Sequence, residues 1–361
     1  TREDKLGRLP VRLALEGSAG EASIALLREA NPAGAMAAGV AVAPALREAP
    51  LPIGLLFPDQ ASQQVGMLAG VKDLPRVQEM LKEARDILGF DVLAVCEEGP
   101  AERLEDPTRG QPAVFLAGLA ALEQLRAENP EAARRCQAVA GLSLGEYAAL
   151  VAAGVLSFGD GLRLVAARAA ALKEAAELAP QAALSVAGLD RARVDALCAR
   201  AREDRGQGEA CQVASVLFQR GYVVGGTRAA VARCAELCKA AKALQVKPLA
   251  VGGALHTPLA EPAVARLEAA FKEVLPRMAP PKCSVFLNVD GRPADVDTAP
   301  QAIADRLVAQ LTSPAQWKSC VEGMVADGIV DFYELGPSKQ LKATIKRIDN
   351  KAWSRTANIE V

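Results

Sequence analysis

The sequence lacks a net charge of either sign, since its 361 residues carry 42 Lys and Arg against 43 Asp and Glu. Proteins that bind nucleic acid or anionic membranes usually present an excess of basic side chains, so this balance favours neither partner. The sequence also lacks any run of about 18 uninterrupted apolar residues, so no transmembrane segment is expected. We therefore expect a globular protein that acts on a small molecule or on another protein.

Metal-binding cysteine patterns are also missing. The chain has eight cysteines, and none of them forms a CxxC pair. Cys234 and Cys238 have the i, i+4 spacing of one helix face, but no histidine lies near them in the sequence. We interpret both as small core residues and expect no metal site. Free thiols of this kind are typical of a reducing compartment.

From residue 51 onward, short apolar segments alternate with longer amphipathic ones, which is typical of an α/β sheet. A chain of this length is expected to form two or three folding units. The clearest strand candidates are Ile53–Phe57, Ala138–Leu142, Ser284–Val289 and Val330–Leu335.

The pattern changes between residues 180 and 250, where the segments predict the order strand, helix, strand, strand, helix, strand. That order is the ferredoxin-like motif. We expect residues 180–250 to form a small domain that is inserted into a larger α/β domain. The larger domain would then consist of residues 51–179 and 251–361.

Residues 1–50 form an alanine-rich N-terminal extension. It contains a candidate strand at Val11–Leu15 and a candidate short helix at residues 21–30. One interpretation of the extension is a docking arm. Because the chain begins with Thr1 rather than Met, a processed or truncated product is expected.

The segment from Gly141 to Gly145 reads GLSLG and lies between a predicted strand and a predicted helix. A GxSxG segment in this context is typical of a nucleophile elbow, in which flanking glycines permit a tight turn. The Ser143 hydroxyl would then project above the sheet and face the amides at the helix N-terminus, which can stabilise an oxyanion. The alternative is a serine that only caps a helix.

A serine nucleophile needs a base, and the chain contains a single histidine, His256. His256 follows Ser143 in the chain, which is the order of the α/β-hydrolase class. The sequence shows no aspartate that would orient the imidazole. A lone histidine is more often an ordinary core or surface residue, so its role stays open at this point.

Seven segments, two of which contain Ser143 and His256, occur in a characteristic order. They read FPDQASQQVGM, GQPAV, AGLSLGEYAALVAAGVLSFGDGLRLVAAR, GALHTPLAEPA, LNVDGRP, QLTSPAQWKSCVEGM and FYELGPSKQLKATIKRI. Together they resemble the malonyl-CoA:acyl carrier protein transacylases of fatty acid and polyketide synthesis, from about Ile53 to Ile348. The resemblance implies an α/β-hydrolase-like large domain with a parallel sheet and an inserted ferredoxin-like (βαββαβ) small domain.

The resemblance also implies catalytic roles. Ser143 is similar to the nucleophile that becomes acylated, and His256 to the base that takes its proton and later returns it to a leaving thiol. Gln310 matches the position whose backbone carbonyl orients the histidine in this family. Such a carbonyl would take the place of the missing acid.

Four more residues match positions of the family that contact substrate. Gln60 and Leu144 match the two backbone amide donors of an oxyanion hole, each of which can be worth about 3 kcal/mol of transition-state stabilisation. Arg168 matches the arginine that holds the free carboxylate of malonate, because a planar guanidinium can grip a carboxylate through two parallel hydrogen bonds. Gln111 matches a glutamine that lines the same pocket.

The sequence departs from the family close to these residues. The family usually reads GQGSQ after Phe-Pro, whereas Asp59 and Ala61 replace the two glycines here. If either position needs a positive φ or close approach to substrate, a side chain there costs about 1 kcal/mol or more. In the small domain, Ser215, Leu217 and Gly221 stand where two asparagines and a glutamine of the acyl and phosphopantetheine tunnel are expected.

Three functions follow from these observations. The first is a working acyltransferase that moves malonyl from malonyl-CoA to the phosphopantetheine thiol of acyl carrier protein; the CoA thioester is a substrate, and no metal or other cofactor is expected. The second is a structural or regulatory subunit of a larger protein complex, with residues 1–50 as its docking arm. The third is a hydrolase, in which water replaces the carrier thiol. For this family, a chain without an initial Met is expected in a plastid or mitochondrion, with a bacterial or eukaryotic cytoplasm as the alternative.

Overall fold

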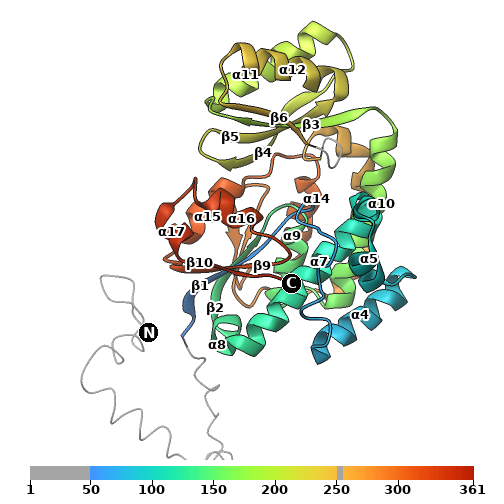
Figure 1. Cartoon of the computed structure of the whole chain (residues 1–361), viewed down its shortest axis with the longest axis vertical. Helices are drawn as coiled ribbons and strands as arrows, with labels where there is room; N and C mark the ends of the chain where they lie inside the picture. Colours follow the sequence, from blue (N-terminus) through green and yellow to red (C-terminus); the bar gives the residue numbers. More distant parts are fainter. Residues whose placement is uncertain (1–48, 250–254) are drawn as a thin grey trace, which may run out of the picture. The chain divides into compact units, whose positions relative to one another are not determined.

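The computed structural model describes residues 49–249 and 255–361 (Figure 1). The strand expected at Val11–Leu15, the helix expected at residues 21–30 and the role of the extension all lie outside the described residues. Pro50–Val361 form one compact unit that contains two β-sheets.

The larger sheet has six strands in the order β10-β9-β1-β2-β7-β8. All neighbouring pairs are parallel except β7 and β8, which are antiparallel. The four strands expected from the sequence in this sheet are confirmed, with small shifts at their ends. The strands are β1 (Leu51–Phe57), β2 (Cys136–Gly141), β7 (Ser284–Leu287), β8 (Arg292–Ala294), β9 (Asp331–Leu335) and β10 (Thr356–Ile359).

Helices cover both faces of this sheet. Successive side chains of a strand point to opposite faces, so the residues of one strand pack into two separate hydrophobic clusters. In β1, Leu55 and Phe57 belong to one hydrophobic cluster and Leu56 to another. The first cluster includes residues of α4 (Pro75–Leu88), α5 (Val92–Glu98), α6 (Ala101–Glu105), α7 (Pro107–Glu128), α8 (Pro130–Arg134), α9 (Gly145–Ala152), α10 (Phe158–Glu177), η1 (Pro258–Ala263), α13 (Val264–Val274), η2 (Leu275–Arg277) and α14 (Pro300–Gln310). The second includes residues of α15 (Trp317–Ala326), α16 (Gln340–Ile345) and α17 (Asn350–Ser354).

The smaller sheet has four antiparallel strands in the order β4-β5-β3-β6. Its two helices cover one face of the sheet (Figure 1). This is the ferredoxin-like arrangement, so the fold class expected from the sequence is confirmed, while the domain limits at residues 180 and 250 stay predictions. In chain order the elements are β3 (Gln181–Ala187), α11 (Arg191–Arg205), β4 (Cys211–Phe218), β5 (Gly221–Thr227), α12 (Arg228–Ala240) and β6 (Gln245–Leu249).

Cysteines gather in the core between these two helices and the smaller sheet. Cys234 and Cys238 are fully buried there, in agreement with their interpretation as core residues. The Sγ atoms of Cys198, Cys211 and Cys234 all lie within 4.8 Å of one another. The sequence did not indicate this group, because its three members come from α11, β4 and α12 and share no short spacing. The expectation that the chain binds no metal stays a prediction.

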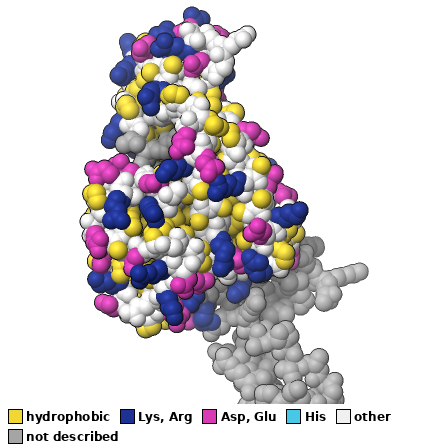
Figure 2. Space-filling model, turned by 90° about the vertical axis from the view of Figure 1, so that its right-hand side faces the viewer, with side chains coloured by type: hydrophobic (Ala, Val, Ile, Leu, Met, Phe, Trp, Pro, Cys, Tyr) yellow, Lys and Arg dark blue, Asp and Glu magenta, His cyan; other side chains and the backbone are white. Residues whose placement is uncertain are grey.

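The surface carries both signs of charge. On the face drawn in Figure 2, basic and acidic side chains are interspersed over the described residues, in keeping with the net charge of −1. Among the described residues, no helix combines the length and the apolar character that crossing a membrane requires.

Candidate active site

Ser143 lies in the turn between β2 and α9, and its backbone has a positive φ of 52°. The two flanking glycines are required by close packing rather than by their own φ angles. A Cβ added to Gly141 would lie 1.9 Å from the carbonyl carbon of Gly145, and a Cβ added to Gly145 would lie 2.1 Å from the carbonyl oxygen of Phe57. The glycines therefore let the helix start directly against β1, which leaves the strained serine at the apex of the turn.

Replacing Gly145 with alanine is expected to lower the free energy of unfolding by about 1–3 kcal/mol or more, because the new methyl group would overlap the backbone of Phe57. Chemical denaturation measures this change. Gly70 provides the matched control, since nothing lies within 4 Å of a Cβ added there. Equal unfolding midpoints for Gly145→Ala and Gly70→Ala would contradict the packing argument.

His256 contacts Ser143 directly. The Nε2 atom of His256 lies 2.8 Å from the Ser143 Oγ, and the Nδ1 atom lies 2.7 Å from the backbone oxygen of Gln310. A carbonyl oxygen can only accept, so Nδ1 carries the hydrogen and Nε2 is free to accept the serine proton. The Gln310 carbonyl thus contacts the imidazole, as the family resemblance predicted.

The imidazole is neutral at physiological pH. Burial, helped by the positive charge of Arg168, lowers the pKa of His256 from 6.5 to about 4, against the raising effect of backbone hydrogen bonds at Gln310 and Ser313. Its backbone also has a positive φ, at 61°. The smaller sheet holds this segment, since the Gln212 side chain donates to the His256 carbonyl at 3.1 Å.

Two buried residues fix the turn and were not assigned a role from the sequence. The Asn288 Oδ1 accepts a hydrogen bond from the Ser143 amide at 2.6 Å, and its Nδ2 donates to the Gly141 carbonyl at 2.7 Å. Glu146 accepts from the Asn288 amide and from the Gln310 side chain. Burial raises the pKa of Glu146 to about 8. Asn288 lies at the end of a predicted strand in the segment LNVDGRP, and Glu146 lies in the apolar predicted helix that follows Ser143. A polar residue at such a position was the sequence signal that could have identified both.

Arg168 projects from α10 into the same site and is only 1% exposed. Its guanidinium donates to the Ser143 Oγ at 3.0 Å and to the Gln111 Oε1 at 2.7 Å, while its buried Nε has no partner. Gln111 in turn donates to the Gln60 Oε1 at 3.0 Å. Among the described residues, no carboxylate forms an ion pair with Arg168. The charge of Arg168 acts on the Asp59 carboxylate only at a distance, without an ion pair. A buried guanidinium that no carboxylate contacts directly is costly, so this arrangement favours a site for an anionic ligand.

The two backbone amides that the family resemblance assigned to an oxyanion hole converge on one point. The amides of Gln60 and Leu144 both donate to the same oxygen, Oδ1 of Asp59, at 2.7 and 3.3 Å. The sequence treated Asp59 only as a missing glycine, whereas the structure places its carboxylate between these donors. Ala61, at the second replaced glycine, has a φ of 81°, which is a strained conformation for alanine.

Burial raises the pKa of Asp59 from 3.8 to about 6. The charge of Arg168, the amides of Gln60 and Leu144 and the Ser143 hydroxyl act in the opposite direction. The carboxyl group is therefore mostly ionised at neutral pH and becomes neutral under mildly acidic conditions.

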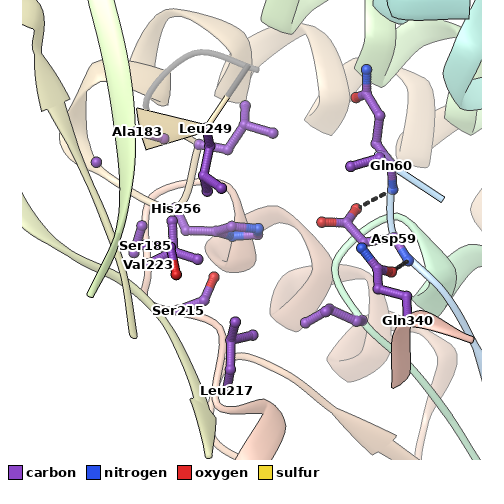
Figure 3. A pocket seen from close by; sticks show the side chains of 15 residues that line it. Asp59, Gln60, Ala183, Ser185, Ser215, Leu217, Val223, Leu249, His256 and Gln340 are labelled. Atoms are coloured by element: carbon purple, nitrogen blue, oxygen red, sulfur yellow. Dashed lines mark hydrogen bonds between the residues drawn. The ribbon is translucent and has the colours of Figure 1, made fainter. Parts of the chain in front are cut away.

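A cavity of about 230 Å³ leads to these groups from between the two sheets. Figure 3 shows His256 and Asp59 pointing toward one another across it. Ser215 and Leu217 line the cavity, but Gly221 does not; a Cβ at Gly221 would lie 2.0 Å from the Phe218 ring. The remaining lining residues are Gln60, Ala61, Leu142, Ala183, Ser185, Ala214, Val223, Gly225, Leu249, Leu255 and Gln340.

All residues expected at the site lie within the described part of the chain and are brought together. Hydrogen bonds link them, with Leu144 joined through Asp59. The roles assigned to them stay predictions. The residues are Gln60, Gln111, Ser143, Leu144, Arg168, His256 and Gln310.

A serine at a strand-to-helix turn, a neutral imidazole on its hydroxyl and a pair of convergent amides define the class of α/β proteins that form acyl-enzymes on serine. Residues 56–357 match the family model described as the acyl transferase domain. The chain belongs to this family.

The relatives are malonyl transferases. The chain is 36% identical over 315 residues to the mitochondrial malonyl-CoA-acyl carrier protein transacylase of Homo sapiens, covering 85% of this chain and 80% of that protein. It is similar to an acyl carrier protein S-malonyltransferase from Vibrio cholerae, with a TM-score of 0.77, 33% identity and coverage of 86% and 98%. A malonyl-transacylase in complex with its type II polyketide acyl-carrier protein gives a TM-score of 0.77, 32% identity and coverage of 86% and 95%.

Proposed function

We propose that the chain transfers malonyl groups from malonyl-CoA to the phosphopantetheine thiol of acyl carrier protein. The observation that carries this proposal is the position of the Ser143 Oγ, which lies between the His256 imidazole and the Arg168 guanidinium. The first group can activate the hydroxyl, and the second can hold the free carboxylate of malonate beside it. The names of the relatives support the same reaction.

In the first half-reaction, Ser143 attacks the thioester carbonyl of malonyl-CoA while the His256 Nε2 takes the hydroxyl proton. The carbonyl oxygen gains the negative charge and is held by the amides of Gln60 and Leu144. When the tetrahedral intermediate collapses, the carbon–sulfur bond breaks and CoA leaves as a thiol with the proton from His256. A malonyl ester remains on Ser143.

In the second half-reaction, the carrier thiol enters the cavity and gives its proton to His256 as its sulfur attacks the ester carbonyl. The same two amides hold the oxyanion. The ester bond then breaks, Ser143 recovers its proton from His256, and malonyl leaves as a thioester of the carrier protein. This sequence is ping-pong and uses no metal or redox step.

A transfer assay with malonyl-CoA and a phosphopantetheinylated acyl carrier protein tests the proposal. We expect malonyl–carrier thioester to accumulate with release of CoA, and the product to depend on the carrier thiol. Release of free malonate at the same rate with and without the carrier would instead support the hydrolase. Absence of both products, together with purification of the chain inside a larger complex, would support the structural subunit.

The pH dependence follows from the low pKa of His256. The base works when neutral, that is above its pKa, so a pKa of about 4 instead of 6.5 extends activity into mildly acidic solution. We expect the rate of acyl-enzyme formation to fall to half near pH 4, as measured by single-turnover quench after a pH jump. A half-loss near pH 6.5 would contradict the assigned environment of the imidazole.

We also propose an organelle, mitochondrion or plastid, as the compartment. The name of the human relative supports this, although the Vibrio cholerae relative comes from a bacterium. Immunofluorescence in the source cells with an antibody against the chain tests it, and an even cytoplasmic signal would contradict it.

A further inference from the structure

We propose that Asp59 determines acyl-group specificity: its carboxylate fills the oxyanion hole until the carboxylate of a malonyl group replaces it as the counter-charge of Arg168. This inference rests on the proposed malonyl transfer and adds a residue that the sequence comparison treated only as a departure. It identifies Asp59 as a gate that a charged acyl group opens and a neutral acyl group does not.

The geometry of the Asp59 carboxylate is that of a bound oxyanion. A single oxygen, Oδ1, accepts hydrogen bonds from both the Gln60 and Leu144 amides, at 2.7 and 3.3 Å. During acyl transfer these donors are needed by the developing negative oxygen of the thioester. The two oxygens cannot occupy one position, so acylation requires the Asp59 side chain to leave.

The backbone around Asp59 is held by contacts that do not involve its carboxylate. The Asp59 amide donates to the Gln340 Oε1 at 3.1 Å, and the Asp59 carbonyl accepts from the Ser62 hydroxyl at 2.7 Å. Figure 3 shows the carboxylate pointing into the cavity, with its bond to the Gln60 amide and the bond of the Asp59 amide to Gln340 drawn as dashed lines. Rotation of the side chain would take the carboxylate off the two amides without breaking these backbone contacts.

Four titratable groups face this part of the site. Arg168 from α10 is cationic, His256 is neutral because burial lowers its pKa to about 4, and Glu146 from α9 keeps its proton because burial raises its pKa to about 8. Asp59 is thus the carboxylate that carries charge here at neutral pH. The charge of Arg168 favours its ionised form, against the effect of burial.

The consequence differs between acyl groups. A malonyl carboxylate on Arg168 supplies a second negative charge beside Asp59. This charge offsets the attraction between Arg168 and the Asp59 carboxylate, so the carboxylate leaves the two amides or takes up a proton more readily. An acetyl group brings no charge, so Asp59 remains the counter-charge of Arg168 and keeps the two amides occupied. Asp59 therefore slows transfer of neutral acyl groups more than transfer of malonyl.

The test compares acylation of the full chain by malonyl-CoA and by acetyl-CoA in the wild type, Asp59→Gly and Asp59→Asn. Because one oxyanion donor alone can change a rate by about 10²–10³, we expect Asp59→Gly to accelerate acetylation by about tenfold or more. Malonylation should change far less, so the malonyl-to-acetyl rate ratio falls. Asp59→Asn keeps the shape without the charge and should lower the same ratio.

Asp73→Gly provides the matched control, since Asp73 is exposed in a turn before α4. Thermal unfolding of each variant shows whether it is folded, and the isosteric Asp59→Asn preserves the comparison if the glycine variant unfolds. An unchanged ratio in both Asp59 variants, or equal slowing of both substrates, would overturn the inference and leave malonyl transfer standing. If malonyl-CoA labels neither the wild type nor any variant, the proposed function fails and the inference fails with it.

A pH series gives a second readout. Below its pKa of about 6, Asp59 binds a proton and loses its charge, while His256 stays neutral down to about pH 4. Wild-type acetylation should therefore rise as the pH falls through about 6, and Asp59→Gly should lack this rise. Identical pH profiles of acetylation in the wild type and in Asp59→Gly would overturn the inference that Asp59 blocks the oxyanion hole.

Discussion

Replacement of Ser143 with alanine is expected to lower the rate of malonyl transfer by about 10⁶-fold, because it removes the oxygen that attacks the thioester. The effect should appear in the chemical step and not in folding, since the hydroxyl contacts only His256, Arg168 and the Asp59 carboxyl within the site. Steady-state transfer to a carrier thiol measures it.

His256→Ala should cause a loss of similar size, and the double variant should lose little more, because nucleophile and base act as one unit. Ser354→Ala is the matched control, since Ser354 is exposed in α17 and bonds only to a backbone carbonyl of its own helix. If Ser143→Ala retained a transfer rate within tenfold of the control, another residue would have to be the nucleophile.

The second large effect is expected at Arg168. Replacing it with alanine removes the buried cation that would bind the malonyl carboxylate, and loss of a group that recognises substrate charge in a closed site should lower malonylation by about 10²–10³-fold or more. Acetylation should fall much less, so the preference for malonyl is relaxed. The ratio of the two acylation rates is the quantity to measure.

Arg163 on the same helix is the control for this experiment, since its side chain is 56% exposed and its ion pair with Asp160 lies outside the cavity. Arg163→Ala should leave both rates unchanged. Equal losses of malonylation and acetylation in Arg168→Ala would remove Arg168 from the carboxylate role, and would leave it as a hydrogen-bond donor to Ser143 and Gln111.

The sequence predicted the fold well because the strands are apolar and separated by strong helical patterns. Phe57 and Leu56 show why the periodicity was informative: a strand covered on both faces is apolar throughout, and both residues are fully buried. The order of the larger sheet could not be read from the chain, since β9 and β1 pair across a long separation. The same holds for the cysteine group, whose members meet only after folding.

The position of Ser143 in the turn between a strand and a helix was predicted from its own motif. His256 was singled out as the single histidine of the chain, and only the family resemblance gave it a role. The roles of Asn288 and Glu146 depend on which backbone atoms they reach, and sequence spacing does not carry that information. The sequence-based prediction and the structure differ most at Asp59. Its replacement of a glycine predicted only a conformational cost of about 1 kcal/mol or more. The structure instead leaves both amide donors convergent and puts the new carboxylate between them.

Intact-protein mass spectrometry of the wild type after brief incubation with malonyl-CoA, followed by peptide mapping, tests the central claim most directly. The account predicts one malonyl group on the peptide that carries Ser143, removable by a carrier thiol. A wild-type protein that stays unmodified, or one that carries the group on a different residue, would contradict it.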